Sequence, residues 1–231
     1  MVPDLSWLFP DLVQASTYAH QIDGLIFWVG LLVLVWFLAA EGIFFWLIWK
    51  FRAKEGQKSQ YLTGKEKHVK RWITIPHGLV LICDIFIVWG SVMVWHNVKQ
   101  RLPEADTTIR VIGQQWAWTF QHPGADNELD TSDDIFTVDD LHVEVDKVYH
   151  FRLESRDVLH SFSVPVFRLK QDAIPGRSIT GWFQPTMTGD HLVQCVEICG
   201  IGHGVMAARI HIEDANQHAA WMSAASAATT P

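Results

Sequence analysis

Two long apolar stretches dominate the N-terminal part of the chain and constrain its fold more than any other feature. They run from about Gly24 to Trp49 and from about Ile73 to Trp95. Each is longer than the roughly 20 residues that an α-helix needs to cross a bilayer. Tryptophans lie toward the ends of both stretches, where amphipathic rings favour the membrane interface. The sequence therefore predicts a transmembrane helical hairpin over residues 1–96, rather than two buried helices of a soluble protein.

The segment between the two stretches predicts their orientation. It carries eight of the 18 basic residues of the chain, at Lys50, Arg52, Lys54, Lys58, Lys65, Lys67, Lys70 and Arg71. Short basic loops remain on the cytoplasmic side of a membrane. We therefore expect residues 50–71 in the cytoplasm, and the N-terminus and everything after Trp95 on the periplasmic side of a bacterial inner membrane. No basic residue precedes Lys50, so we expect the first span to stay in place rather than be cleaved as a signal peptide.

The part of the chain that follows the hairpin is polar and acidic. Residues 97–231 contain ten basic and 18 acidic residues, which gives them a formal charge of −8, whereas the whole chain carries −7. An acidic domain repels nucleic acid and attracts cationic partners. We therefore expect no nucleic acid among the partners of this chain.

Apolar residues alternate with polar ones through much of this acidic part, as they do in half-buried β-strands. The alternation predicts strands at residues 109–112, 116–121, 141–145, 149–153, 178–183, 191–195 and 206–213. Many short strands separated by turns favour a sandwich or barrel. We expect this β-domain to span residues 97–214 and to be followed by an Ala- and Ser-rich tail at 215–231, which contains a short helix.

Four metal-binding side chains lie in one short loop between two of the predicted strands. They are Cys195, Cys199, His203 and Met206, in a Cys-x3-Cys-x3-His-x2-Met pattern. Thiolate, imidazole and thioether together favour copper over hard cations. A disulfide would not require the histidine and the methionine, and zinc has little use for a thioether. The spacing therefore predicts a copper site, which still needs a second imidazole; His160 is the foremost of several candidate histidines.

Three further motifs accompany this loop in a fixed order. They are Gln115-Trp116-Ala117-Trp118, the hexapeptide Asp157-Val158-Leu159-His160-Ser161-Phe162, and the segment from Leu169 to Arg177. With the hairpin ahead of them, these motifs resemble subunit II of cytochrome c oxidase over roughly residues 20–214. The resemblance implies a two-helix transmembrane hairpin followed by an all-β, cupredoxin-like Greek-key domain.

The resemblance also implies a dinuclear copper centre, CuA, and a set of ligands for it. Cys195 and Cys199 would bridge both coppers, and His160 and His203 would each give one nitrogen. Met206 would bind one copper weakly, and the carbonyl of Glu197 would complete the other. The carboxylate of Glu197 would also reach a magnesium ion at the border with the catalytic subunit.

The activity implied by the resemblance is electron transfer within a haem–copper terminal oxidase. Electrons would arrive singly from a basic cytochrome c and would leave to haem in catalytic subunit I, where oxygen is reduced to water; further membrane subunits would complete the complex. Trp116 matches the residue that receives electrons, and Asp157 matches an acidic residue of the docking face. Two alternatives remain open: a CuA-containing nitric oxide reductase, and a membrane-anchored copper carrier.

The sequence departs from the family pattern near Trp116 and in one acidic loop. Ala117 stands where an aromatic residue is common, and Gln114 stands where a histidine is common. The loop at residues 124–134 is rich in carboxylates, which makes it either a solvated turn or a calcium-binding loop. We expect the solvated turn, because the loop lacks the full spacing of a known calcium site.

The most consequential departure lies in the predicted spans. Many members of the family carry a glutamate at the mouth of a proton channel, where this chain has Val69, with Glu66 nearby. The spans instead contain Glu41 and Asp84, at similar expected depths. Acids inside a bilayer are costly and usually functional. They predict either a proton route that replaces the missing carboxylate or pairing with a basic residue of a partner subunit.

Overall fold

The computed structural model describes residues 13–58 and 61–229, which divide into two compact units. One unit is the helical hairpin from Asp23 to Asn97. The other contains residues 13–22 and 98–229. The short segment before the first long helix therefore packs with the β-domain: Ser16 donates a hydrogen bond to the carbonyl of Phe167 at 3.0 Å, and Tyr18 lies edge-on to Trp182.

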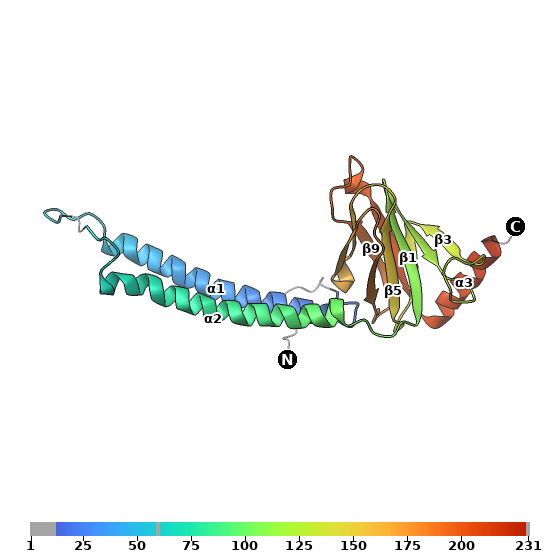
Figure 1. Cartoon of the computed structure of the whole chain (residues 1–231), viewed down its shortest axis with the longest axis horizontal. Helices are drawn as coiled ribbons and strands as arrows, with labels where there is room; N and C mark the ends of the chain where they lie inside the picture. Colours follow the sequence, from blue (N-terminus) through green and yellow to red (C-terminus); the bar gives the residue numbers. More distant parts are fainter. Residues whose placement is uncertain (1–12, 59–60, 230–231) are drawn as a thin grey trace. The chain divides into compact units, whose positions relative to one another are not determined.

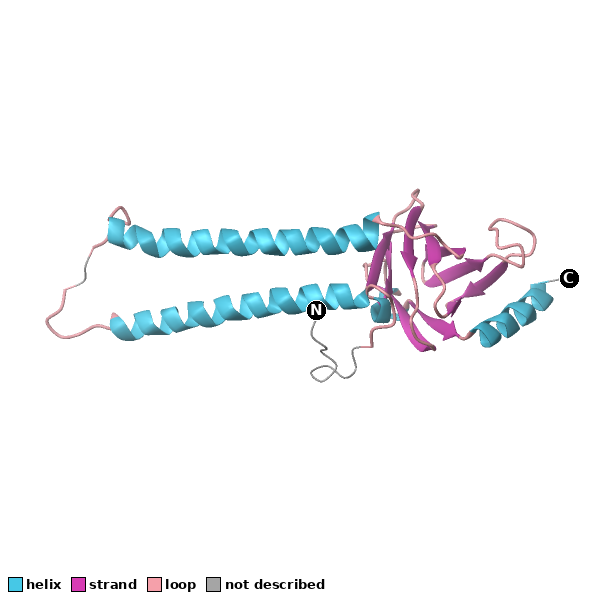
Figure 2. Cartoon of the chain, turned by 90° about the horizontal axis from the view of Figure 1, so that it is seen from below, coloured by secondary structure: helices cyan, strands magenta, loops and turns pink. Residues whose placement is uncertain are grey.

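The hairpin consists of two long helices, α1 (Ala19–Lys50) and α2 (Lys67–Trp95), and a π-helical turn, η1 (His96–Gln100), follows α2 (Figure 2). Both helices are long and apolar enough to cross a membrane, with mean hydropathies of 2.4 and 2.1 in their most apolar windows. Large side chains connect them: the indole of Trp36 donates to Cys83 Sγ at 3.4 Å, and Trp46 stacks on Trp72. The predicted pair of apolar helices is confirmed.

The two intramembrane acids do not lie at the same depth, so that expectation was wrong. The Trp36–Cys83 and Trp46–Trp72 contacts set how the antiparallel helices are aligned. With a rise of 1.5 Å per residue, this alignment places Asp84 about 10 Å farther from the connecting loop than Glu41. Among the described residues, neither the Glu41 nor the Asp84 side chain forms a hydrogen bond or ion pair.

The β-domain is a sandwich of two five-stranded sheets (Figure 1). The first sheet has the order β3-β2-β1-β5-β8 and the second has the order β4-β10-β9-β6-β7. The first sheet contains β1 (Thr107–Gln114), β2 (Ala117–His122), β3 (Ile135–Val138), β5 (Tyr149–Ser155) and β8 (Ile179–Phe183). The second contains β4 (Asp140–Glu144), β6 (His160–Val164), β7 (Leu169–Ala173), β9 (Gly189–Cys195) and β10 (Ala207–Glu213). Two 3-10 turns, η2 (Pro165–Phe167) and η3 (His203–Val205), and the terminal helix α3 (Ala215–Thr229) complete the unit.

Aromatic side chains fill the space between the two sheets. Phe162 is fully buried, and its ring contacts those of Trp118, Phe120 and Phe151 at centroid distances between 5.4 and 6.3 Å. A Cβ atom at Gly181 would lie 2.2 Å from the Phe151 ring, so only glycine lets β8 approach β5 at this point. This packing gives the second sheet a rigid foundation on which the metal-binding residues are placed.

The predicted strands are confirmed, but three strands were not predicted. They are β3, β6 and β7. All five residues of β6 are buried, including Ser161 and Ser163, although polar and apolar residues alternate from Ser161 to Val164. The prediction was also wrong at Trp116, because β2 begins one residue later, at Ala117. The tail forms the 15-residue helix α3, longer than the short helix that was expected.

Candidate metal centre

The metal-binding loop joins two neighbouring strands of the second sheet, β9 and β10. A backbone hydrogen bond of 3.1 Å from Cys195 to Met206 closes the loop at its base. The same sheet brings in the distant histidine, because β6 pairs with β9 and places Phe162 opposite Cys195. His160 begins β6, two residues before Phe162. Sheet pairing therefore brings residues 35 positions apart to one point.

The donor atoms of these side chains lie at distances expected for shared metal ions. The two sulfurs of Cys195 and Cys199 are 3.7 Å apart, far beyond the roughly 2.05 Å of a disulfide bond. Two sulfurs that each lie about 2.3 Å from one metal, at a tetrahedral angle, would be about 3.7 Å apart. The cysteines are therefore free thiols spaced so that both sulfurs could bind a common metal ion, which excludes the disulfide.

The remaining donors divide between the two sulfurs. On one side, Cys195 Sγ lies 4.0 Å from His160 Nδ1 and 3.3 Å from the carbonyl oxygen of Glu197. On the other, Cys199 Sγ lies 3.7 Å from His203 Nδ1 and 3.8 Å from Met206 Sδ. The structure thus brings together all six donors that the sequence analysis named. Their soft and borderline character fits copper.

Burial makes the Cys199 thiol a poor ligand until a metal displaces its proton. His160, Cys195, Cys199 and Met206 are all buried. Burial and the neighbouring Cys195 raise the pKa of the Cys199 thiol to about 11. A metal binds the thiolate form, so loading of the site releases protons and becomes more favourable as the pH rises.

Asp157 fixes the orientation of His160. Its Oδ1 accepts a hydrogen bond from His160 Nε2 at 2.8 Å, which leaves Nδ1 directed at Cys195. Its Oδ2 accepts the backbone N–H of Gln115 at 2.7 Å. Burial raises the pKa of Asp157, whereas these hydrogen bonds lower it. The hydrogen bonds prevail, so the pKa lies below its usual value. Such carboxylate partners orient ligand histidines in many metal sites. The docking role of Asp157 remains a prediction.

Trp116 lies directly on the metal-binding loop, in the turn between β1 and β2. Its indole Nε1 donates to the carbonyl oxygen of Cys199 at 3.3 Å, and the side chain of Gln115 donates to the same oxygen at 2.8 Å. A Cβ atom at Gly202 would lie 2.4 Å from the indole ring. Trp116 is 38% exposed, so its side chain reaches from solvent to the backbone of Cys199, a predicted copper ligand. Sequence analysis named Gln115 only as part of a motif and missed Gly202; the glycines that follow Cys199 were the available signal for Gly202.

Several carboxylates of the acidic loop accept hydrogen bonds from the protein itself. Asp130 forms a bidentate ion pair with Arg110, at 2.7 and 2.8 Å, which lowers the pKa of the carboxyl group. Asp134 accepts hydrogen bonds from the backbone N–H of Asp130 and from the side chain of Gln121. A solvated turn was expected at residues 124–134; these contacts support a turn rather than a calcium-binding loop.

Comparison with known proteins agrees with this geometry. A family model described as "Cytochrome C oxidase subunit II, periplasmic domain" matches residues 107–213. The alternative cytochrome c oxidase subunit 2 of Bradyrhizobium diazoefficiens is 29% identical, over 94% of this chain and 83% of the relative. The cytochrome c oxidase subunit 2 of Cereibacter sphaeroides is also 29% identical, over 95% of this chain and 80% of the relative.

A solved structure shows the same fold for the β-domain. The crystal structure of the periplasmic domain of subunit II of cytochrome oxidase from Bradyrhizobium japonicum matches with a TM-score of 0.51 and 29% identity. The match covers 56% of this chain and all of that domain. The predicted fold class is thereby confirmed. Together with the hairpin and the cluster of copper-binding donors, these matches show that the chain is similar to subunit II of cytochrome c oxidase, with the family model covering its β-domain.

Proposed function

We propose that this chain accepts electrons one at a time at a dinuclear copper centre of the CuA type and passes them to haem in a separate catalytic subunit, where oxygen is reduced to water. The observation that carries the proposal is the arrangement of the donors. Two sulfurs 3.7 Å apart each have a further imidazole and a weaker donor beside them, which provides ligands for two metal ions rather than one.

The protein holds these ligands in positions that need to change little during electron transfer. In this proposal Cys195 and Cys199 bridge the ions, while His160 and His203 each bind one. Met206 and the carbonyl of Glu197 complete the two sites. When bound, the copper pair would supply the one-electron redox chemistry. The surrounding sandwich and the Asp157 carboxylate would keep the reorganisation small, because His160 is buried and held at both ring nitrogens.

Trp116 is the proposed point of electron uptake. Its exposed edge can contact a donor protein, and its Nε1–H leads through the Cys199 carbonyl to a bridging sulfur. The acidic charge of residues 97–231 suits a basic cytochrome c as the donor. A copper carrier would have no use for an indole fixed in this position. The two relatives are named as oxidase subunits, which supports oxygen over nitric oxide as the terminal acceptor.

The hairpin would anchor the copper domain beside its catalytic partner. No residue is buried in the most apolar stretch of α1 or of α2. The surfaces of both stretches are therefore available to lipid or to other membrane subunits. We propose that residues 50–71 face the cytoplasm and that the copper domain faces the periplasm. Magnesium is part of the same proposal. Among the described residues, no cluster of three or more His, Cys, Asp or Glu includes Glu197, so the ion would need ligands from the catalytic subunit.

Two measurements on the copper-loaded full chain in detergent test this function. Electron spin resonance should show one unpaired electron shared by two coppers. Rapid mixing with reduced cytochrome c should reduce the centre at a rate that falls as ionic strength rises, because salt screens attraction between the proteins. A mononuclear copper signal would refute the site, and a rate that is flat or rises with salt would refute docking through the acidic domain.

The Gly202→Ala variant tests the role of Trp116. The new methyl group would lie 2.4 Å from the indole ring and must displace it. We expect the copper absorption spectrum to be retained and the rate of reduction by cytochrome c to fall by about 10-fold or more, since misplacing a reactive group by about 1 Å can cost 100-fold. Gly204→Ala is the matched control, because nothing lies within 4 Å of its added methyl group. Equal rates in the two variants would count against uptake through Trp116.

Glu41 and Asp84 remain our proposal for a proton route in place of the carboxylate missing at Val69. The offset of about 10 Å between them along the hairpin means that bound water must connect them if they act in series. We expect Glu41→Gln and Asp84→Asn each to slow oxygen reduction by the assembled oxidase while leaving copper reduction by cytochrome c unchanged. Full turnover in both variants would assign the acids to contacts with a partner subunit instead.

A further inference from the structure

A second cluster of histidines and carboxylates lies on the outer face of the second sheet, near the end of β10 and beside α3. Its members are Asp140 and His142 of β4, Asp190 of β9, and His211 and Glu213 of β10. His211 stands opposite His142 on one neighbouring strand and opposite Asp190 on the other. Residues opposite one another in a sheet project from the same face, so the three strands present these side chains together.

The two histidines direct their Nε2 atoms at a shared carboxylate. Asp140 Oδ1 lies 2.7 Å from His211 Nε2, and Asp140 Oδ2 lies 3.5 Å from His142 Nε2. One donor atom from each of these three residues lies within 4.8 Å of the others. Metal–nitrogen and metal–oxygen bonds to zinc are about 2.0–2.2 Å long, which separates neighbouring ligand atoms by about 3.3 Å. Small side-chain shifts would therefore let one ion bind all three.

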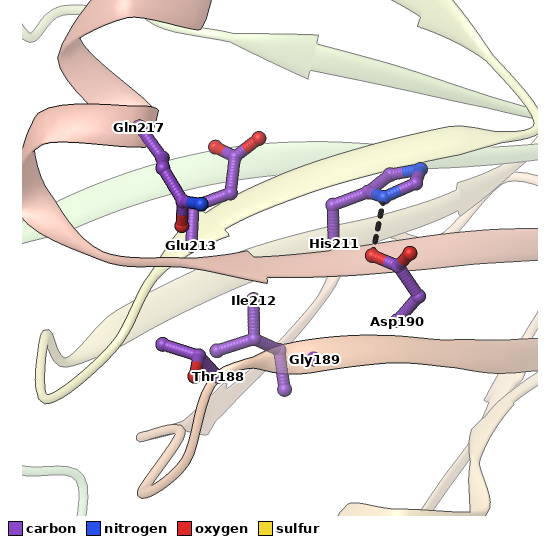
Figure 3. Close-up of a pocket in the computed structure, with 7 residues that line it drawn as sticks. All are labelled: Thr188, Gly189, Asp190, His211, Ile212, Glu213 and Gln217. Carbon is purple, nitrogen blue, oxygen red and sulfur yellow. Dashed lines mark hydrogen bonds and ion pairs between the residues drawn. The ribbon is translucent and has the colours of Figure 1, made fainter.

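A second carboxylate holds the far side of each imidazole. His142 Nδ1 lies 2.8 Å from Glu213 Oε1, and His211 Nδ1 lies 2.7 Å from Asp190 Oδ1; Figure 3 shows the latter contact. This is the arrangement in which protein metal sites fix the tautomer of a ligand histidine and leave Nε2 free for the metal. Both His142 and His211 have this arrangement, and both direct Nε2 at the shared carboxylate of Asp140. A single surface ion pair would need only one imidazole and one carboxylate.

The surroundings of the cluster favour a cation that enters from solvent. Three carboxylates face two imidazoles, so the cluster is negative even when both rings are protonated. Trp221 of α3 stacks on His142, with ring centroids 4.2 Å apart and planes inclined by 10°, and thereby fixes that ring from behind. Asp140, the shared carboxylate, is 48% exposed. His211, Asp190 and Glu213 line an adjoining pocket of about 420 Å³, which Asp140 and His142 do not line (Figure 3). The ligand side of the cluster is therefore accessible.

We propose that Asp140, His142 and His211 bind one divalent transition metal ion of the zinc class, with a fourth position open to water. Two imidazoles and one carboxylate match the three protein ligands of open zinc sites. The absence of sulfur among these ligands disfavours cuprous copper, and the two nitrogens disfavour magnesium and calcium. His211 follows Met206 by five residues along β10, about 17 Å at the rise of a strand, so this site is separate from the copper centre.

The competing interpretation is an imidazole–carboxylate network that holds protons and no metal. Titration of the full chain in detergent with zinc separates the two, provided that copper is loaded first so that Cys195 and Cys199 are occupied. We expect one further equivalent of zinc to bind and to raise the melting temperature, since an ion that binds the folded state stabilises it. Cobalt as a probe should give ligand-field absorption without thiolate charge transfer.

Variants of the cluster locate the bound ion. His211→Gln should abolish the added equivalent. Asp190→Asn, which changes an exposed positioning residue and not a ligand, should weaken zinc affinity by about 10- to 100-fold with the copper spectrum unchanged. His191→Gln, on β9 but outside the cluster, is the matched control and should bind zinc as the parent does. No zinc bound by the copper-loaded parent, or equal affinity in the parent and in both cluster variants, would overturn the proposal.

Discussion

Replacement of Cys199 by serine is expected to abolish electron uptake by this chain. Cys199 Sγ lies within 3.8 Å of Cys195 Sγ, His203 Nδ1 and Met206 Sδ, so its loss removes the donor at the centre of the cluster. Loss of a mere hydrogen-bonding partner of a metal ligand costs about 10- to 100-fold in affinity or activity. Loss of a bridging ligand should cost more than about 100-fold, measured as the rate at which reduced cytochrome c reduces the copper-loaded chain.

The chain contains its own control for this experiment. Cys83, the third cysteine, lies in α2 and accepts a hydrogen bond from Trp36, within the other structural unit. Cys83→Ser should retain the copper spectrum and the rate of the parent chain, whereas Cys199→Ser should lose the spectrum of a shared unpaired electron. Normal reduction rates in the Cys199→Ser variant would show that the bridging thiolate pair is not the site of electron uptake.

The second large effect is expected at His122, which limits the stability of the β-domain in acid. His122 is buried at the end of β2, and its ring meets that of Trp221 edge-on, with centroids 4.9 Å apart. Burial, and to a lesser degree His142 and His218, lowers the pKa of His122 to about 3. The unfolded chain binds a proton near the usual value of about 6.5. Folding therefore loses stability as the pH falls from about 6.5 toward 3, and the loss between pH 7 and 5 is on the order of 2 kcal/mol.

The His122→Phe variant should remove this part of the pH dependence. Phenylalanine preserves an aromatic contact with Trp221 and replaces a buried ring nitrogen that lacks a hydrogen-bond partner in the described part of the chain. Urea unfolding of parent and variant at pH 7 and at pH 5 gives the comparison. If the substitution changes the packing free energy equally at both pH values, that change cancels when the free energy of unfolding at pH 5 is subtracted from that at pH 7. Equal losses of stability in the two proteins would mean that His122 does not contribute.

The metal ligands could be predicted because most of them lie close together in the sequence. Cys195, Cys199, His203 and Met206 form one loop, and the chemistry of their side chains indicates copper before any fold is known. His160 could be chosen only through the resemblance to a family. The β6–β9 pairing that carries it to the loop joins strands far apart in the sequence, and no local pattern indicates that these strands are neighbours.

The cluster around His211 could not be predicted from the sequence, for a related reason. Asp140 and His142 lie far along the chain from Asp190 and His211, and each occupies an outward position of an ordinary alternating strand. Alternation predicts which residues face outward but not which strands are neighbours. The parallel pairing of β4 with β10 creates the cluster, and such non-local pairing leaves no trace in local sequence patterns.

The two ends of the copper loop, Cys195 and Met206, are joined by a backbone hydrogen bond, and the loop is held further by bonds from Val196 to Ser161 and from Gln115 and Trp116 to Cys199. Metal selectivity in this protein is nevertheless modular: the loop can be exchanged between β9 and β10 while the sandwich and His160 are left in place. Chimaeras that carry shorter loops with one cysteine would convert a two-metal relay into a one-metal site on the same scaffold. The loop is accordingly the part of the molecule on which redox properties can be engineered without rebuilding the fold.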